Sequence, residues 1–140
     1  MSKIAVIYWS GTGNTEAMAN SIVEGIQGIT SDVELFNVSE ISAADAAGYD
    51  KIVLGCPAMG SEELEEDEME PFFTELEGSL SGKKVALFGS YGWGDGEWMR
   101  NWADRVQAAG ATLINGEGLI VNDAPEGPEC VEFGVSIANA

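Results

Sequence analysis

The chain has 140 residues and a mass of 14.8 kDa, which predicts one domain spanning residues 1–140. Its 24 acidic residues exceed its six basic ones, giving a net charge of −18 and a pI near 4.1. That field disfavours nucleic acid and anionic membranes as partners and favours a basic protein surface and a monomeric state. Because histidine is absent, His-based acid–base catalysis and metal ligation by histidine are excluded.

The two cysteines, Cys56 and Cys130, form no C-x-x-C motif. The sequence leaves a disulfide between them open, and the interpretation we favour is a reduced protein of the cytoplasm. We expect no signal peptide, because the apolar run at residues 3–8 is too short and a glycine turn follows it. No stretch approaches the roughly 18 apolar residues that a membrane span needs.

Short apolar runs alternate along the chain with patterns of helical period. The expected strands are residues 3–8, 32–36 (an edge strand), 51–56, 83–88 and a last strand, 112–114 with 119–121, interrupted at Asn115-Gly116. Five helices are expected. The first carries Met18, Ile22, Val23 and Ile26 and ends near Gly28, and the second begins at Ser42. The remaining three are marked by Met69, Phe72, Phe73 and Leu76, then by Trp98, Trp102 and Val106, and last by Val131, Gly134, Val135 and Ala138. This order predicts an α/β fold whose parallel sheet has helices on both faces.

In such a fold, ligands bind beyond the carboxyl ends of the strands. Three segments follow strands there: residues 9–15, 57–62 and 89–96, which we name the first, second and third segments. They are unlike one another in sequence, so we expect them to contact different parts of one ligand.

The first segment contains Ser10-Gly11-Thr12-Gly13-Asn14-Thr15 and leads directly into a helix. Hydroxyls, an amide and the free N–H groups of a helix N-terminus suit a phosphate. A dinucleotide loop would need a third glycine where Glu16 stands, and a Walker loop would need a Gly-Lys-Ser/Thr sequence that is absent. The alternative is an ordinary strand–helix turn with Ser or Thr capping.

The second and third segments suit a flat ligand. Trp93 lies among four glycines, where little can pack against it, and its ring is suited to stacking on a planar group. Met59 suits the second face of that group, and Gly60 permits a positive φ. The alternatives are a loop tryptophan packed on itself and a methionine in a surface loop.

The other tryptophans and the cysteines carry weaker signals. Trp98 and Trp102 lie one helical turn apart and are predicted to pack in the core or at its boundary. Trp9 stays open. Cys56 ends a buried strand and Cys130 falls on the last helix, so both are predicted to be structural.

Taken together, S-G-T-G-N-T, A-M-G-S-E and F-G-S-Y-G-W-G-D-G make the chain resemble the short-chain flavodoxins over its whole length. The resemblance implies a three-layer flavodoxin-like sandwich with a five-stranded parallel sheet of order 2-1-3-4-5. Flavodoxin is itself the standard example of that order, with FMN at the switch point, so the order comes from the resemblance and not from the pattern.

The resemblance also implies a site for FMN. Its residues are Ser10, Gly11, Thr12, Gly13, Asn14, Thr15, Ala58, Met59, Gly60, Glu62, Gly89, Ser90, Tyr91, Gly92 and Trp93. The first segment would bind the phosphate, and Met59 and Trp93 would flank the isoalloxazine. Glu62 would accept from flavin N3–H, the Gly89 backbone would meet the pyrimidine edge, and the Gly60 carbonyl would turn toward N5–H on reduction. No catalytic residue and no metal site are expected.

By the same resemblance the protein is a one-electron carrier and not an enzyme. It would shuttle non-covalent FMN between semiquinone and hydroquinone at low potential, serving redox enzymes in place of ferredoxin. The acidic run at residues 62–70 would dock basic surfaces of low-potential oxidoreductases and of flavodoxin or ferredoxin reductases. The alternative for this run is a solvated helix start.

Two other functions are alternatives to an electron carrier. An FMN-dependent quinone or nitro-reductase would need a second pocket and usually a dimer, for which the chain has little length left. A phospho-receiver signalling domain would need an aspartate where Cys56 stands and acids where Tyr8-Trp9 stand. Ser61, Asn122 and Asp123 are left outside the predicted site, because the sequence assigns them no role.

Overall fold

The computed structural model describes residues 3–11, 13–59, 64–91, 96–116, 118–122 and 128–140 of the chain. The strands are β1 (Ile4–Tyr8), β2 (Val33–Asn37), β3 (Lys51–Gly55), β4 (Lys84–Tyr91), β5 (Thr112–Leu113) and β6 (Leu119–Asn122). The helices are α1 (Asn14–Gln27), α2 (Ala43–Ala46), α3 (Met69–Glu77), α4 (Glu97–Ala108) and α5 (Pro128–Asn139), with short 3₁₀ turns η1 (Val38–Glu40) and η2 (Ile114–Gly116).

The strands form one parallel sheet in the order β2-β1-β3-β4-β5, which confirms the predicted 2-1-3-4-5 arrangement with β2 at the edge. Both β5 and β6 pair with β4. β5 lies beside Lys84 and Val85, whereas β6 lies beside the stretch from Phe88 to Tyr91. They are therefore two parts of one interrupted strand, as predicted, and η2 makes the interruption.

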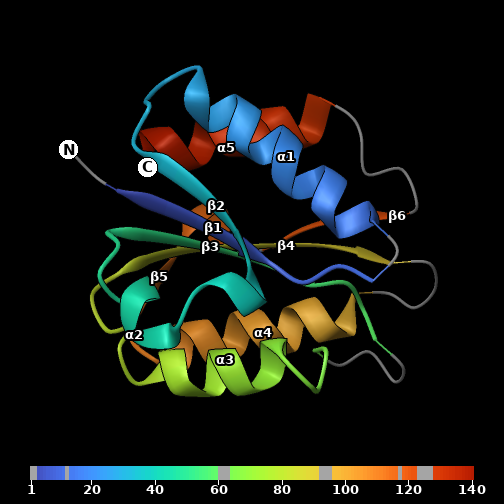
Figure 1. The fold of residues 1–140 in the computed structure, drawn as a ribbon, viewed down its shortest axis with the longest axis vertical. Coiled ribbons are helices and arrows are strands. Elements are labelled where there is room, and N and C mark those ends of the chain that lie inside the picture. The colour runs from blue at the N-terminus through green and yellow to red at the C-terminus, as the bar shows by residue number, and fades with distance from the viewer. Residues whose placement is uncertain (1–2, 12, 60–63, 92–95, 117, 123–127) are drawn as a thin grey trace.

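Helices cover both faces of the sheet, with α1 and α5 on one side and α2, α3 and α4 on the other (Figure 1). Side chains alternate along each strand, so neighbouring residues enter different cores. In β1, Ile4 and Val6 pack with α1 and α5, whereas Ala5 and Ile7 pack with the other three helices. The parallel strands at the centre are thus buried on both faces, which explains their continuous apolar sequences.

The last helix exists as predicted, but the prediction of its buried face is wrong in part. The predicted face was Val131, Gly134, Val135 and Ala138, and the buried residues are Cys130, Phe133, Gly134 and Ile137. The reason is a backbone-to-backbone contact with α1. A Cβ atom added to Gly134 would lie 2.1 Å from the Ile22 carbonyl oxygen, and one added to Gly25 would lie 2.1 Å from that of Val131. This glycine contact fixes the rotation of α5.

The fourth strand is longer than predicted. The sequence ended it at residue 88, whereas β4 continues through Gly89, Ser90 and Tyr91, which lie on a strand and not in a loop. The extension forms because β6 pairs with it on one side and the Ala58 N–H donates to the Ser90 carbonyl at 3.1 Å on the other. Three residues of the third segment are therefore held by the sheet.

The sheet has two distinct ends. We name the end at Tyr8, Gly55 and Tyr91 the carboxyl end, and the end at Ile4 and Lys51, where the central strands begin, the amino end. Because all strands are parallel, the connections that follow β1, β3 and β4 all leave from the carboxyl end. The segments predicted to bind a ligand lie there.

Candidate functional site

Hydrogen bonds bring the three segments together at the carboxyl end. The hydroxyls of Thr15 and Ser90 lie 2.9 Å apart, and both side chains are buried. The Ala58 N–H bonds the Ser90 backbone, so Ser90 contacts both other segments. The structure thus assembles residues 75 positions apart into one site. Five predicted site residues lie outside the described residues: Thr12, Gly60, Glu62, Gly92 and Trp93.

The first segment forms the start of α1. Gly13 is the N-cap, with φ +96° and ψ −10°, a left-handed conformation that favours glycine. Its N–H donates to Ser10 Oγ at 3.0 Å, which folds the segment back on itself. A Cβ atom on Gly13 would meet nothing within 4 Å, so the space in front of it is open. An open glycine cap before a 14-residue helix, flanked by hydroxyls, fits a phosphate.

Gly89 is the point of closest packing behind the site. A Cβ atom there would lie 2.2 Å from the Cys56 carbonyl oxygen and 3.0 Å from the Trp98 ring. The Trp98 indole donates to that same carbonyl at 3.1 Å. Strands β3 and β4 and helix α4 therefore converge here, and Gly89 has no room for a side chain.

The cysteines and the helical tryptophans are core residues, as predicted. Cys56 and Cys130 are buried thiols. Burial raises the pKa of Cys56 to about 12, which keeps the thiol neutral. Burial likewise raises the pKa of Cys130 to about 11. Trp98 and Trp102 are each 1% exposed, and among the described residues the Trp102 indole nitrogen is a buried donor without a hydrogen-bond partner.

Within the acidic run, Glu65 is buried, which the sequence did not indicate. Its carboxylate accepts the N–H groups of Asp67 at 2.8 Å, Glu68 at 2.7 Å and Met69 at 3.0 Å. These are the donors at the start of α3, so Glu65 caps that helix from outside it. An acid within a stretch of acids gives no hydrophobic or spacing signal from which burial could be inferred.

Glu70, also in the acidic run, is paired. Arg105 donates to its two oxygens at 2.7 and 2.9 Å and to Glu77 at 3.1 Å. The Arg105 hydrogen bond lowers the pKa of Glu70 despite partial burial. The same guanidinium lies 4.7 Å from the centre of the Phe73 ring. Glu70 therefore joins α3 to α4, and the exposed described acids of the run are Glu66, Asp67 and Glu68.

Trp9, which the sequence left open, connects the first segment to the acidic run. Its indole nitrogen donates to Glu68 Oε1 at 3.3 Å. Its ring also lies so close to Gly11 that a Cβ atom there would be 3.0 Å away. Trp9 is half-buried, so it supports the first segment from the side of α3.

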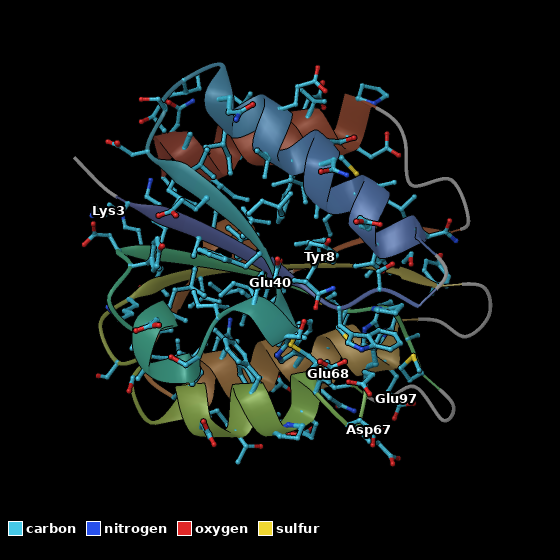
Figure 2. All side chains as sticks on the ribbon, in the orientation of Figure 1. Lys3, Tyr8, Glu40, Asp67, Glu68 and Glu97 are labelled. Carbon is cyan, nitrogen blue, oxygen red and sulfur yellow. The ribbon has the colours of Figure 1, made fainter. Side chains whose placement is uncertain are left out.

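Most basic residues lie away from the carboxyl end of the sheet. The exception is Arg100 near the start of α4, whose Nη1 would lie 3.8 Å from a Cβ atom at Gly96. Glu40, Asp67, Glu68 and Glu97 lie toward the carboxyl end and Lys3 toward the amino end (Figure 2). The other lysines also belong to the amino end: Lys51 and Lys84 are the first residues of β3 and β4, and Lys83 precedes β4. All four lysines of the chain thus lie away from the predicted site.

One carboxylate at the carboxyl end interacts directly with β1. The Tyr8 hydroxyl donates to Glu16 Oε2 at 3.0 Å. Burial, and then the Glu16 hydrogen bond, raise the pKa of Tyr8, so its hydroxyl stays protonated. Glu16 is in the first turn of α1, next to the predicted phosphate position.

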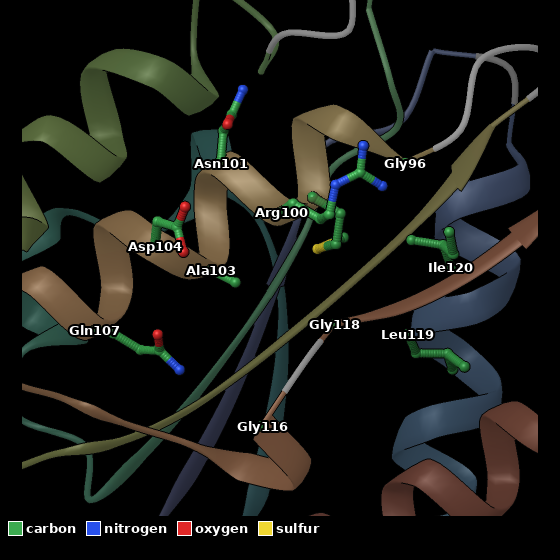
Figure 3. A pocket seen from close by; sticks show the side chains of 11 residues that line it. Gly96, Arg100, Asn101, Ala103, Asp104, Gln107, Gly116, Gly118, Leu119 and Ile120 are labelled. Atoms are coloured by element: carbon green, nitrogen blue, oxygen red, sulfur yellow. The ribbon is translucent and has the colours of Figure 1, made fainter.

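A hollow of about 670 Å³ opens between α4 and the β5–β6 interruption (Figure 3). Figure 3 shows Arg100 on its helix side and Leu119 and Ile120 on its strand side. None of the predicted FMN residues that the structure describes lines this hollow. Among the described residues, α4 and the stretch from Gly116 to Ile120 form its walls.

Metal clusters and membrane-spanning helices are both absent from the described part of the chain. No group of three or more Cys, Asp or Glu side chains there could hold a metal ion. No helix there has the length and hydropathy needed to cross a membrane.

Comparisons with known proteins agree on one family. The flavodoxin family model matches residues 6–134. A flavodoxin from Megasphaera elsdenii is 53% identical over 138 residues, covering 98% of this chain and 99% of that one. A flavodoxin from Clostridium beijerinckii is 48% identical over 135 residues, covering 96% and 98%. The solution structure of two-electron reduced Megasphaera elsdenii flavodoxin superposes with a TM-score of 0.90, covering 98% and 99% of the two chains.

Proposed function

The chain belongs to the flavodoxin family of FMN-binding electron carriers, and from this premise we propose that it is a low-potential one-electron carrier serving redox enzymes in place of ferredoxin. The observation that carries the proposal is the buried hydrogen bond between Thr15 and Ser90, because it joins the phosphate-type first segment to the third segment. When bound, FMN supplies the redox chemistry, and the protein supplies its position and surroundings.

The first segment holds the phosphate through neutral donors. These are the side chains of Ser10, Thr12, Asn14 and Thr15 and the backbone of Gly11 and Gly13. The open space at Gly13 and the α1 N-terminus support this assignment. Met59 and Trp93 would flank the ring system, and the Gly89 backbone would meet its pyrimidine edge. Glu62 is assigned to the N3–H edge and Gly60 to the N5 edge.

The charge at the carboxyl end favours a low potential. Carboxylates there oppose any negative charge added to a bound group. At about 10 Å, with an effective dielectric of 20–80, each contributes roughly 0.4–1.7 kcal/mol before salt screening. Glu16, Glu40, Glu68 and Glu97 come from four different elements, so the opposition comes from several directions. The four lysines lie at the amino end, whereas Arg100 near the start of α4 lies at the carboxyl end and offsets part of this opposition.

The partner surface is the exposed part of the acidic run. Glu66, Asp67 and Glu68 offer carboxylates beside the site to the basic surface of a reductase or another low-potential oxidoreductase. Glu65 and Glu70 do not take part, because one is buried and the other is paired with Arg105. The protein acts as a monomer, since its charge opposes self-association. We place it in the cytoplasm, which the two buried thiols support.

The test separates a carrier from an enzyme. The FMN-loaded protein is mixed with NAD(P)H and a quinone or nitro-aromatic acceptor, with and without an added ferredoxin reductase. A carrier shows no steady NAD(P)H oxidation alone and supports electron flow once the reductase is present, and salt slows that flow. Steady NAD(P)H oxidation by the protein alone would contradict the proposal and indicate a quinone or nitro-reductase.

A further inference from the structure

The buried carboxylate of Glu65 makes several hydrogen bonds, unlike the exposed acids of the acidic run. It is 5% exposed and accepts three backbone N–H groups at the start of α3. Its own carbonyl accepts the Glu70 N–H at 2.8 Å. A carboxylate that gathers several N–H donors at a helix start is stabilised by those bonds and by the helix dipole.

The same residue is tied to the end of β3. The Glu65 N–H donates to Cys56 Sγ at 3.4 Å, and the Cys56 N–H bonds the Phe88 carbonyl at 3.1 Å. Leu64, the residue before it, is buried at 6% exposure in the core beneath α3. The chain therefore returns to the sheet at Leu64 and Glu65, directly behind the second segment.

Two described residues, Ala58 and Glu65, are hydrogen-bonded at the carboxyl end of the sheet. The Ala58 N–H bonds the Ser90 carbonyl, and the Glu65 N–H bonds Cys56 Sγ. Because a chain spans at most about 3.3–3.6 Å per residue, the positions of Ala58 and Glu65 are coupled.

We propose that Glu65 is a positioning residue for FMN binding, fixing through Cys56 and the start of α3 where the chain that begins at Met59 returns to the sheet. This inference rests on the proposed function. A glutamine is not an equivalent replacement, because its amide would present an N–H₂ group toward at least one of the N–H groups that the carboxylate accepts. Loss of the carboxylate loosens the return point and weakens FMN binding without any contact between Glu65 and FMN.

The experiment compares Glu65→Gln with Glu66→Gln, which removes the same charge from an exposed neighbour. FMN dissociation constants are measured by quenching of FMN fluorescence, and amide hydrogen exchange is measured on the FMN-free proteins. We expect Glu65→Gln to weaken FMN binding about tenfold and Glu66→Gln by less than about twofold. In the FMN-free protein, Glu65→Gln accelerates exchange at Asp67 and Glu68 and also at Ala58.

A second variant guards against misfolding of the first. Cys56→Ala removes the sulfur acceptor of the Glu65 N–H and leaves the carboxylate in place, and it is expected to weaken FMN binding in the same direction. Exchange that accelerates only at the α3 start, with Ala58 and FMN affinity unchanged in Glu65→Gln, would show a helix cap alone and overturn the inference. Failure of the unsubstituted protein to bind FMN would instead overturn the proposed function, and the exchange result at Ala58 would still test the positioning role.

Discussion

The two ends of the sheet differ in the partners of their polar groups. At the amino end, polar groups are satisfied within the protein. The Lys51 ammonium donates to the Ile137 and Ala138 carbonyls at 2.9 and 3.1 Å, and Lys83 donates to the Tyr49 carbonyl at 3.0 Å. Burial, and then Lys84, lower the pKa of Lys51, so its position is costly and is held by the α5 carbonyls.

The helix starts at the carboxyl end differ from the start of α2. Helices α1 and α4 both begin there on glycines with positive φ, +96° at Gly13 and +90° at Gly96. By contrast α2 begins on Ser42, whose hydroxyl accepts the Asp45 N–H. A left-handed glycine cap stabilises a helix less than serine does. A Cβ atom at Gly13 would meet no described atom within 4 Å, whereas one at Gly96 would lie 2.9 Å from Ile120 Cδ1. Of these two helix starts, only that of α1 therefore leaves room for another group.

The largest expected effect comes from breaking the link between the first and third segments. Thr15→Val removes both the Thr15–Ser90 hydrogen bond and a hydroxyl that we assign to the phosphate. It leaves the buried Ser90 hydroxyl without this partner, which costs about 1–3 kcal/mol. FMN affinity, measured by fluorescence quenching, is expected to fall about 5- to 100-fold. The matched control is Thr30→Val at the amino end, which removes a hydroxyl that accepts the Asp32 N–H at 3.2 Å. Equal FMN affinity in the two variants would contradict the comparison.

The next effect separates two buried tryptophans on one helix. Trp98 donates to the Cys56 carbonyl behind the site, whereas the Trp102 nitrogen is unpaired within the described structure. Trp98→Phe is therefore expected to lower the free energy of unfolding by about 1 kcal/mol more than Trp102→Phe. Urea unfolding of the FMN-free variants measures the difference. A larger loss in Trp102→Phe would show that the Cys56 carbonyl does not need this donor.

A charge reversal at each end sharpens the electrostatic contrast. Glu97→Lys changes an exposed residue at the carboxyl end, and Glu24→Lys makes the same change at an exposed position near the far end of α1. The more negative reduction midpoint is expected to rise by about 30 mV or more in Glu97→Lys at low salt. The shift in Glu24→Lys is expected to be much smaller. Similar shifts in both variants would mean that net charge matters and position does not.

The smallest effect concerns the helix layer between the two ends. Arg105 lowers the pKa of Glu70, so this pair stabilises the protein fully above the ordinary glutamate pKa and loses that contribution as pH falls through the lowered one. Since both side chains are about one-third exposed, Glu70→Gln is expected to cost only about 0.5–1 kcal/mol at pH 7.

Thermal unfolding as a function of pH checks this pair. The difference between the original protein and Glu70→Gln should shrink as the solution is acidified from pH 7 to below pH 4. Glu75→Gln, an exposed position on the same helix, is the control and should show no such trend. A difference that stays constant with pH would contradict the assigned pair.

Most elements could be predicted from the sequence because apolar period and turn chemistry agree locally, as at α1 before Gly28. The end of β4 could not be predicted, because Gly89-Ser90-Tyr91 carries no strand signal and its partner strand β6 lies about 30 residues further along the chain. The face of α5 depends on backbone contacts at Gly25 and Gly134, which side-chain patterns do not encode.

The candidate site also has features that the sequence predicted and features that it did not. The composition of the three segments predicted their place, and the structure brings Thr15, Ala58 and Ser90 together as expected. The acidic run was misleading in detail, because hydropathy cannot distinguish the buried Glu65 from its solvated neighbours. The separation of all four lysines from the site likewise required the strand directions, which only the fold supplies.

The most direct test of the account is the visible absorption spectrum of the FMN-loaded protein during stepwise anaerobic reduction. A one-electron carrier is expected to show a long-wavelength band that rises during the first step and disappears during a second step at a distinctly more negative potential. Bleaching in a single two-electron step, or no uptake of FMN at all, would contradict the claim that the carboxyl end of the sheet is a one-electron flavin site.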